Sequence, residues 1–305
     1  MSFLLRRGAT PQLALQALNE AITRLQNAVG GKLSSPAAEY VKALPDVEMH
    51  LGNAFNREWV AETLYTPRCW HLMEIAHLTI PEQDFIYFST SDPSELEEFE
   101  RKQNVEIIRL GSANNAASNE RRLQMERLEE IREDVRELET FASMGGTILI
   151  IDTNTLMHAN PLDQIVWTRN GIAKGELVRA LVPLAVIAEL DRKKFEAHDS
   201  TKRKAADAIR RLYKQRKGFN PDVPASFITT DKTTLALEIP RDDLGRTRTA
   251  NTDDEIRDFG VFVKGITGRP VTIVTRDMNL HMKCQRVGLE VLWLDDDDMK
   301  QIQPN

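Results

Sequence analysis

The stretch Thr147–Asp152, TILIID, decides the fold expected for the second half of the chain. Five β-branched or apolar residues in succession suit a strand that is buried on both faces, and an acid follows directly. The stretch Val271–Thr275, VTIVT, repeats this pattern, and Asp277 lies two residues beyond it. Both acids therefore come at the carboxyl ends of apolar strands, the edge at which an open parallel sheet binds ligands.

Helical and strand-like patterns alternate around these two strands. Apolar runs occupy Leu181–Leu184, Ser226–Thr229 and Glu290–Leu294. Helical patterns begin near Ala173 and cover Val186–Lys194, Lys202–Lys217, Asp253–Lys264 and Asn279–Val287. This alternation predicts an α/β domain over residues 146–298, with a central parallel sheet covered on both faces.

The first part of the chain, residues 1–110, has a different pattern. Leucines and isoleucines at helical spacing predict a helix over Pro11–Val29, with Thr10 as its N-cap and Pro11 in its first turn. Short strands are expected at Asp84–Phe88 and Val105–Leu110, with a helix starting near Ser94 between them. We therefore predict a mixed α+β N-terminal domain, in which Trp59, Trp70 and His71 are packing residues.

Residues 111–145 are expected to join the two domains. Gly111–Ser118 is small and polar and predicts a linker or loop. The charged stretch Asn119–Phe141 predicts a long helix with a short apolar seam at Leu128, Ile131, Val135 and Leu138. Two heptads are too few to hold a dimer alone, so docking on one of the domains is favoured over self-association as a homodimer.

Composition excludes several classes of protein. The 305 residues are 41% hydrophobic and 28% charged, which is typical of an ordinary soluble chain. No apolar stretch approaches the roughly 20 residues that cross a bilayer, and MSFLLRRGAT lacks the apolar core of a secretory signal. Only two cysteines occur, in different halves, so we expect reduced thiols, a cytoplasmic location and no structural zinc site.

Charge is unevenly distributed along the chain. The net charge is −6, yet the segment from Arg192 to Lys217 holds eleven Lys or Arg against three acids, a net +8, which leaves −14 for the remainder. A local basic surface on an acidic protein can hold a polyanion. A solvated helix face would have the same composition, and charge alone does not separate the two interpretations.

Two further acids accompany Asp152 and Asp277. Glu189 lies on the predicted helix that begins near Pro183, and Asp253 opens another after Asn251-Thr252, where it can also serve as a helix cap. Carboxylates about 4 Å apart repel by about 4 kcal/mol per pair at an effective dielectric of 20. A cluster of this kind requires protons or a cation, and an all-oxygen site suits Mg²⁺ or Mn²⁺ better than zinc.

In this order the motifs resemble the PIN domain, a family of mostly ribonucleases with an α/β/α sandwich fold. The matching stretches are IIDTN (Ile150–Asn154), LVPLAVIAELDRKK (Leu181–Lys194), NTDDEI (Asn251–Ile256) and TRDMNLHMK (Thr275–Lys283). The resemblance implies that Asp152, Glu189, Asp253 and Asp277 are the catalytic and metal-binding acids, with Asp254 as an alternative to Asp253. Asn154 matches the small polar position that follows the first acid.

The resemblance implies hydrolysis of RNA phosphodiester bonds with Mg²⁺ or Mn²⁺. Endonucleolytic cleavage is favoured, with exonucleolytic cleavage as the alternative. Side chains near the acids and on the basic segment are then expected to bind the substrate: Thr153, Asn154, Lys193, Lys194, Arg210, Arg211, Arg276 and Lys283. The stretch carrying the resemblance, residues 147–295, is about half of the chain and says nothing about the N-terminal residues.

Other enzyme classes fit the sequence less well than a nuclease does. A haloacid dehalogenase-type phosphatase needs a second Asp two residues after the first acid, and that position is Asn154. No GxxxxGK[ST] or GxGxxG phosphate-binding loop occurs. A nucleic-acid-binding adaptor that uses the basic helix 202–217 remains an alternative. The acidic run Asp295–Asp298 is interpreted as a solvated tail rather than as a metal site.

Overall fold

The structure is a computed structural model that describes residues 4–30, 35–76, 93–196, 198–216, 224–241 and 245–299. The side chains of residues 74–76, 93–110, 196 and 216 lie outside this description. The chain divides into two compact units, Phe3–Leu138 and Glu139–Asn305. No helix in the described part of the chain is both long and apolar enough to span a bilayer.

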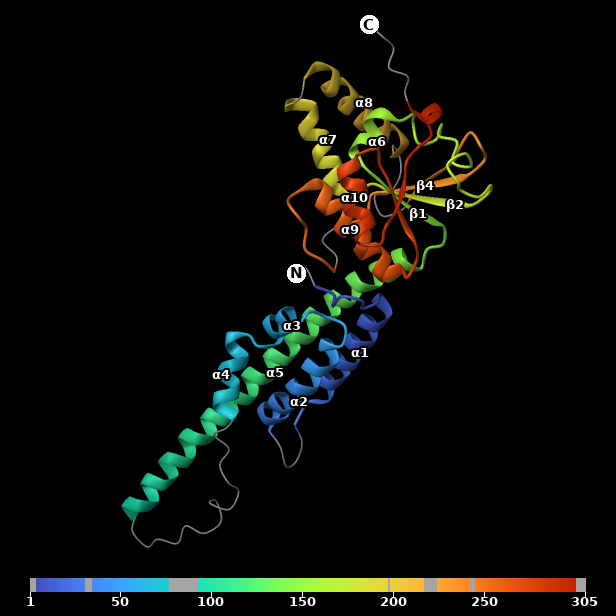
Figure 1. Cartoon of the computed structure of the whole chain (residues 1–305). Coiled ribbons are helices and arrows are strands. Elements are labelled where there is room, and N and C mark those ends of the chain that lie inside the picture. Colours follow the sequence, from blue (N-terminus) through green and yellow to red (C-terminus); the bar gives the residue numbers. More distant parts are fainter. Residues whose placement is uncertain are drawn as a thin grey trace. The chain divides into compact units, whose positions relative to one another are not determined.

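The first unit is built from helices (Figure 1), namely α1 (Pro11–Asn27), α2 (Pro36–Gly52), α3 (Arg57–Leu64), α4 (Pro67–Ala76) and most of α5 (Pro93–Ser143). The start of α1 is confirmed: Thr10 Oγ1 accepts a hydrogen bond from Leu13 N, and proline occupies the first turn. The strand predicted at Val105–Leu110 is wrong, because these residues lie inside α5. The strand predicted at Asp84–Phe88 lies outside the described residues. The described part of this unit is therefore helical where a mixed α+β domain was expected.

Helix α5 also runs through the expected linker, so the loop predicted at Gly111–Ser118 is wrong. Its small residues serve packing instead, since Ala113 and Ala117 are buried one turn apart. The apolar seam that ends at Leu138 is buried as well, and Gln124 Nε2 donates to Leu64 O at 2.8 Å. Docking of this helix within a domain is confirmed, whereas self-association stays a prediction.

Of the three expected packing residues, Trp59 is buried, whereas Trp70 and His71 are exposed, so the prediction is wrong for those two. Trp70 lies beside the ring of Tyr65, with centroids 5.5 Å apart. Both cysteines are free and buried.

The second unit is an α/β/α sandwich around one six-stranded sheet. The strands are β1 (Thr147–Ile151), β2 (Leu177–Leu181), β3 (Ala225–Ile228), β4 (Thr234–Glu238), β5 (Val271–Val274) and β6 (Glu290–Leu292), in the order β3-β4-β2-β1-β5-β6. The sheet is parallel except for the antiparallel pair β3–β4. Its helices are α6 (Thr153–His158), α7 (Leu184–Glu196), α8 (Asp199–Arg216), α9 (Thr252–Thr267) and α10 (Met278–Arg286), followed by a 3₁₀ turn, η2 (Asp296–Asp298).

Strand β1 lies at the centre of the sheet, a position that suits its apolar sequence because both faces of a central strand are covered. It pairs with β2 on one side and β5 on the other, and four of its five residues are buried. Gly146 opens the strand with φ +105°, and a Cβ there would lie 2.7 Å from Leu177 O. Helix α9 packs on β5, and a Cβ at Gly260 would lie 2.8 Å from Leu289 Cδ1, so glycine lets α9 approach the sheet closely.

Two strands differ from the prediction. The prediction of a helix beginning near Ala173 is wrong, because strand β2 begins at Leu177. Strand β4 was not predicted. Each strand carries a charged residue that interrupts its apolar pattern: Arg179 in β2 and Glu238 in β4. Both are buried and form a two-pronged ion pair, with N–O distances of 2.6 and 2.7 Å.

The acidic run near the C-terminus is only partly solvated. Asp298 is buried, and its carboxylate accepts hydrogen bonds from Val166 N at 3.1 Å and Asn170 Nδ2 at 2.7 Å. The interpretation of the run as a solvated tail is therefore wrong for Asp298, which fastens the β1–β2 connection to η2.

Candidate active site

Asp152 lies at the carboxyl end of the central strand and is almost wholly buried, with 2% of its surface exposed. It caps α6, since Oδ1 accepts hydrogen bonds from the backbone N–H groups of Asn154 and Thr155. Burial raises the pKa of its carboxyl to about 6, and the Glu189 carboxylate adds to the rise. Hydrogen bonds from Thr275, Thr155 and Asn154 act in the opposite direction. Asp152 is thus a carboxylate whose negative charge is poorly compensated.

Asp277 takes the same role at the end of the neighbouring strand. It caps α10 by accepting hydrogen bonds from Asn279 N at 2.7 Å and Leu280 N at 3.1 Å. Both acids therefore also have a structural role, because each one satisfies the free N–H groups of a helix start.

Thr275 connects these two acids. Its hydroxyl donates to Asp152 Oδ2 and accepts a hydrogen bond from Asp277 N at 2.9 Å. The residue is fully buried, and its backbone N donates to Leu292 O at 3.2 Å, so its position follows from the β5–β6 pairing. Thr275 was not among the residues expected at the site, although the pattern Thr-x-Asp directly after an apolar strand marks the position.

Glu189 reaches the same edge from the middle of α7. Thr153 Oγ1, one residue after Asp152, donates to Glu189 Oε2 at 2.6 Å. Lys193, one turn further along α7, lies 2.9 Å from Glu189 Oε1. The expected substrate-binding residues Thr153 and Lys193 therefore both contact the glutamate carboxylate directly.

Asp253 is held from two sides near the start of α9. Asn279 Nδ2 donates to Asp253 Oδ2 at 3.1 Å, and Lys283 Nζ lies 3.6 Å from the same oxygen. The cap of α9 is Asn251, whose Oδ1 accepts from Asp254 N at 3.1 Å. Capping therefore does not account for Asp253, contrary to the competing explanation drawn from the sequence.

Asp254 faces a different set of partners. Its Oδ1 lies 3.0 Å from Arg257 Nη1 and 3.2 Å from Lys283 Nζ. Only Asp253 is bonded to Asn279, whose own backbone N–H is bonded to Asp277. This contact favours Asp253 over Asp254 as a member of the site.

Glu189, Asp152, Asp277 and Asp253 thus form an acid row, linked in this order through Thr153, Thr275 and Asn279. The row follows the carboxyl ends of β1 and β5. Strands β2 to β4 are added on one side of β1, and β5 and β6 on the other, so the strand order switches sides between β1 and β5. Among the described residues, no three Asp, Glu, His or Cys side chains come close enough together to hold a metal ion. Convergence of all four acids on one cation therefore stays a prediction.

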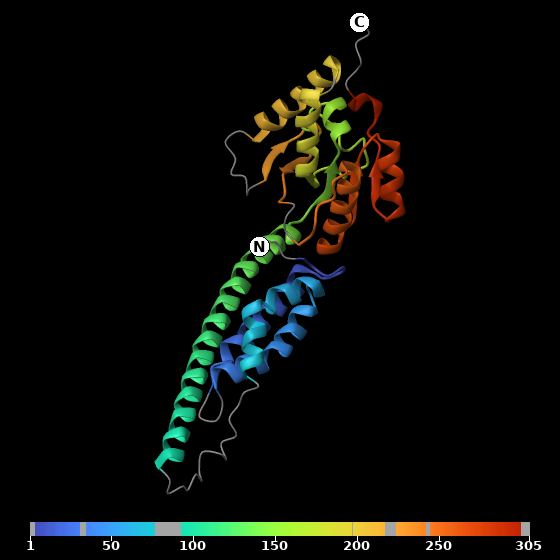
Figure 2. The same ribbon diagram turned by 90° about the vertical axis from the view of Figure 1, so that its left-hand side faces the viewer.

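The remaining expected substrate-binding residues fall into two groups. Lys194, next to the ring of Phe195, and Arg210, 75% exposed, present their charges on α7 and α8. These two helices lie side by side in both views (Figure 1, Figure 2). Asn154 is half-buried in the first turn of α6.

Arg211 and Arg276 have structural partners instead. Arg211 Nη2 donates to Leu156 O at 2.7 Å, which ties α8 to α6. Arg276 Nη2 donates to Leu294 O at 3.1 Å and to Asp296 Oδ1. Both guanidinium groups are therefore engaged within the domain.

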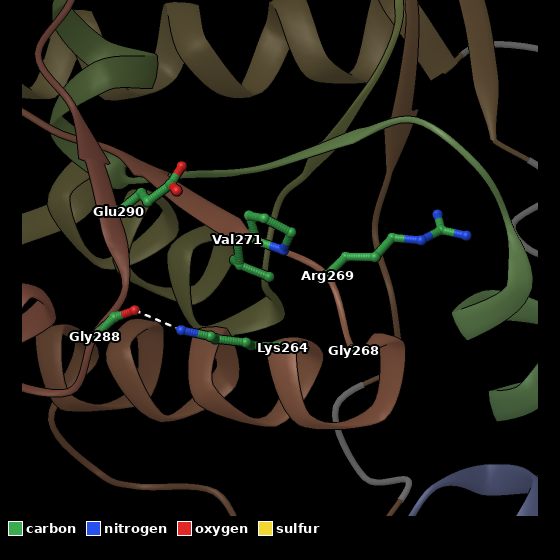
Figure 3. Close-up of a pocket in the computed structure, with 7 residues that line it drawn as sticks. Lys264, Gly268, Arg269, Val271, Gly288 and Glu290 are labelled. Atoms are coloured by element: carbon green, nitrogen blue, oxygen red, sulfur yellow. Dashed lines mark hydrogen bonds between the residues drawn. The ribbon is translucent and has the colours of Figure 1, made fainter.

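An open pocket of about 340 Å³, drawn in Figure 3, lies at the amino ends of β5 and β6, whereas the acid row lies at the carboxyl ends of the strands. It is formed where β5 and β6 begin, at Val271 and Glu290. Its two cationic side chains are already bonded, Lys264 Nζ to Gly288 O at 2.7 Å and Arg269 to Met144 O. The pocket is not part of the acid-lined site.

Comparison with known proteins identifies the domain that carries this site. No curated protein matches the chain. A family model for the PIN domain matches residues 149–294, a span that includes the whole acid row. PIN domains are as a family metal-dependent nucleases with the α/β/α fold described above. The C-terminal half of this chain is a PIN domain.

Proposed function

We propose that the chain is a ribonuclease that hydrolyses RNA phosphodiester bonds with Mg²⁺ or Mn²⁺ at the acid row. One observation carries the proposal: four acidic side chains from separate elements lie in a row along the carboxyl edge of the sheet. They are connected through Thr153, the chain neighbour of Asp152, and through hydrogen bonds of Thr275 and Asn279. Burial raises the pKa of Asp152, which means that its negative charge is unfavourable in the structure as it stands. Binding of a cation would stabilise that charge, which supports a metal site.

The donor set fits a hard divalent cation. Asp152, Glu189, Asp253 and Asp277 offer only carboxylate oxygens, which Mg²⁺ and Mn²⁺ prefer. Such an ion, when bound, supplies activation of a water molecule and stabilisation of the charge that develops on the phosphate. Lys193 on Glu189 and Lys283 on Asp253 provide the positive charge in this structure.

The surrounding residues orient these carboxylates. Thr153 fixes one oxygen of Glu189, Thr275 fixes one oxygen of Asp152, and Asn279 fixes one oxygen of Asp253. The contacts to Asp277 and to Asp253 fall on one carboxylate oxygen each, whereas both oxygens of Asp152 and of Glu189 already have partners within the domain. The half-buried Asn154, at the start of α6, is the side chain we assign to the attacking water or to the substrate phosphate.

The exposed basic side chains on α7 and α8 are proposed to hold the RNA strand. Ala205, Ala208 and Leu212 of α8 face the core, which leaves Lys202, Arg203, Arg210 and Lys214 exposed. Contacts of this kind neutralise phosphates and weaken steeply with salt. The free buried thiols fit a reducing, cytoplasmic location, which we also propose.

The alternative is an adaptor that binds nucleic acid without cleaving it efficiently. The observation in its favour is that Lys193 and Lys283 already pair with two of the four acids. An adaptor would bind RNA equally well with and without a chelator, and its bound RNA would stay intact in Mn²⁺.

Cleavage of labelled RNA in Mn²⁺ separates the two functions. We expect Asp152→Asn to lower the cleavage rate by about 100-fold or more, because even residues that only support metal ligands are worth 10- to 100-fold. Asn still caps a helix, so the variant keeps the start of α6. Asp191→Asn, at an exposed acid of the same domain, is the matched control and should cleave normally. Equal residual cleavage by wild type and Asp152→Asn would overturn the nuclease assignment.

A further inference from the structure

Trp293 stands at the same edge of the sheet as the acid row. Asp152 N donates to Val274 O at 3.3 Å, and Thr275 N donates to Leu292 O at 3.2 Å. These bonds extend the pairing of the strands by one residue beyond Ile151–Val274 and Val274–Leu292, so Asp152, Thr275 and Trp293 are neighbours across β1, β5 and β6. Adjacent strands are about 4.8 Å apart, which puts the Trp293 backbone roughly 10 Å from that of Asp152.

The indole of Trp293 is exposed and yet held in place. Its side chain keeps 44% of its surface open to solvent. The Arg276 guanidinium lies over the ring, 5.5 Å from the centroid, and His281 packs edge-on at 6.4 Å. Arg276 is fixed in turn by Leu294 O and Asp296. A large aromatic ring is therefore presented to solvent in one orientation.

One face of α10 also carries exposed apolar side chains. Met278, His281 and Met282 are three and four residues apart and so share one face of the helix. Met278 is 62% exposed and Met282 is 48% exposed, whereas Leu280 and Cys284 on the other face are buried. The core does not use these methionines. Exposed apolar side chains that gather on one helix face mark a binding site more often than an isolated apolar residue does.

Charge around Trp293 argues for a flat, uncharged ligand group. Three exposed acids follow the tryptophan closely, but Asp296 is paired with Arg276, and Arg169 lies 3.9 Å from Asp295 and 3.3 Å from Asp297. Two guanidinium groups offset two of these three negative charges, so the surface offers a polyanion no strong attraction. Phosphate contacts belong on α7 and α8, where the exposed cations are.

We propose that Trp293, with Met278 and Met282, is a nucleobase-stacking site for a single strand of RNA that crosses the acid row. The inference rests on the proposed ribonuclease function and adds its substrate class. Every base has a π-face, so the site is expected to be tolerant of sequence. Bases in a duplex have both faces covered by their neighbours, so the site selects unpaired RNA.

The test measures binding of the full chain in the presence of EDTA, so that cleavage does not interfere. The two probes are a short uridine-only RNA and a ribose-phosphate strand of the same length that has no bases. We expect Trp293→Ala to weaken binding of the uridine strand about tenfold, the range of one stacked base, and to leave the abasic strand unaffected. Trp293→Phe should retain most of the affinity.

Trp70→Ala is the matched control, because Trp70 is also exposed (57%) but belongs to the N-terminal unit. It should change neither affinity. Equal weakening of both probes by Trp293→Ala would overturn the stacking site in favour of a structural role. Unchanged affinity for both probes would also overturn the stacking site, and the exposed surface would then be attributed to binding of a protein partner. If wild type cleaves RNA in Mn²⁺ and Trp293→Ala binds normally, the stacking site fails while the nuclease stands.

Discussion

Thr275 donates its hydroxyl hydrogen to Asp152 Oδ2, and this contact joins the acids that end the two central strands. Both residues are buried, so the bond forms away from competing water. Such a bond to a charged acceptor is worth more than one between neutral groups, about 1.5–3 kcal/mol. Thr275 therefore stabilises the carboxylate form of Asp152 as well as fixing its direction.

Thr275→Val tests this contact. We expect a loss of about 2 kcal/mol in unfolding free energy. Because the bond from Thr275 lowers the pKa of Asp152, its loss should also move the acid limb of the pH–rate profile for RNA cleavage to higher pH. Thr275→Ser keeps the hydroxyl and should restore both values. An unchanged acid limb in the valine variant would show that the bond does not control Asp152.

Asp152→Asn should stabilise the fold at neutral pH while abolishing cleavage. The pKa of Asp152 is raised from 3.8 to about 6, so the folded state binds the proton more tightly than the unfolded state does. Stability is therefore lost as pH rises from about 4 to above 6, by roughly 3 kcal/mol in total for a shift of this size. Asparagine carries no charge and should remove this loss.

Urea unfolding in EDTA at a series of pH values measures the effect. The variant should be more stable than wild type at pH 7, and the difference should vanish near pH 4. A difference that is the same at all pH values would contradict the raised pKa as its cause.

The Arg179–Glu238 pair should be strongly coupled. Removing either partner leaves a buried charge without compensation, which typically costs 3–5 kcal/mol. Arg179→Met should cost more than Glu238→Gln, because Arg179 Nη1 also donates to Phe141 O at 2.9 Å and Met144 O at 3.2 Å. The double variant should be less destabilised than the sum of the single variants. Additive losses in a double-mutant cycle would argue against coupling.

Arg210 and Arg211 are adjacent in sequence and should behave differently. Arg210→Gln should leave stability unchanged and reduce the salt dependence of RNA binding by about 0.7 in log–log slope, the value for one phosphate contact on a single strand. Arg211→Gln should lower the melting temperature, because it removes the bond to Leu156 O. Salt titrations of binding and thermal unfolding check both. A stable Arg211→Gln variant with a reduced salt slope would reassign Arg211 to the substrate.

Much of the PIN domain was predictable because its signals are local. The apolar strands at Thr147–Ile151 and Val271–Val274, and the helices that follow, are recognised from runs of neighbouring residues. Strands β2 and β4 were not predicted because each contains a charged residue, Arg179 or Glu238. Such a charge is tolerated in a buried strand only when it is paired, and here its partner lies 59 residues away in the sequence. Small residues at Ala113 and Ala117 suggested a loop for the same reason: the surface that they pack against is distant in sequence.

The sequence by itself indicated four candidate acids and placed Asp152 and Asp277 after strands that share one edge. The tertiary structure alone decided how these acids are connected. It showed that both are helix caps, that Asn251 rather than Asp253 caps α9, and that Thr275 and Asn279 link the row. The physical reason is that a hydrogen bond depends on distance and direction between groups, and residues distant in sequence, such as Thr275 and Asp152, acquire these only when the sheet forms.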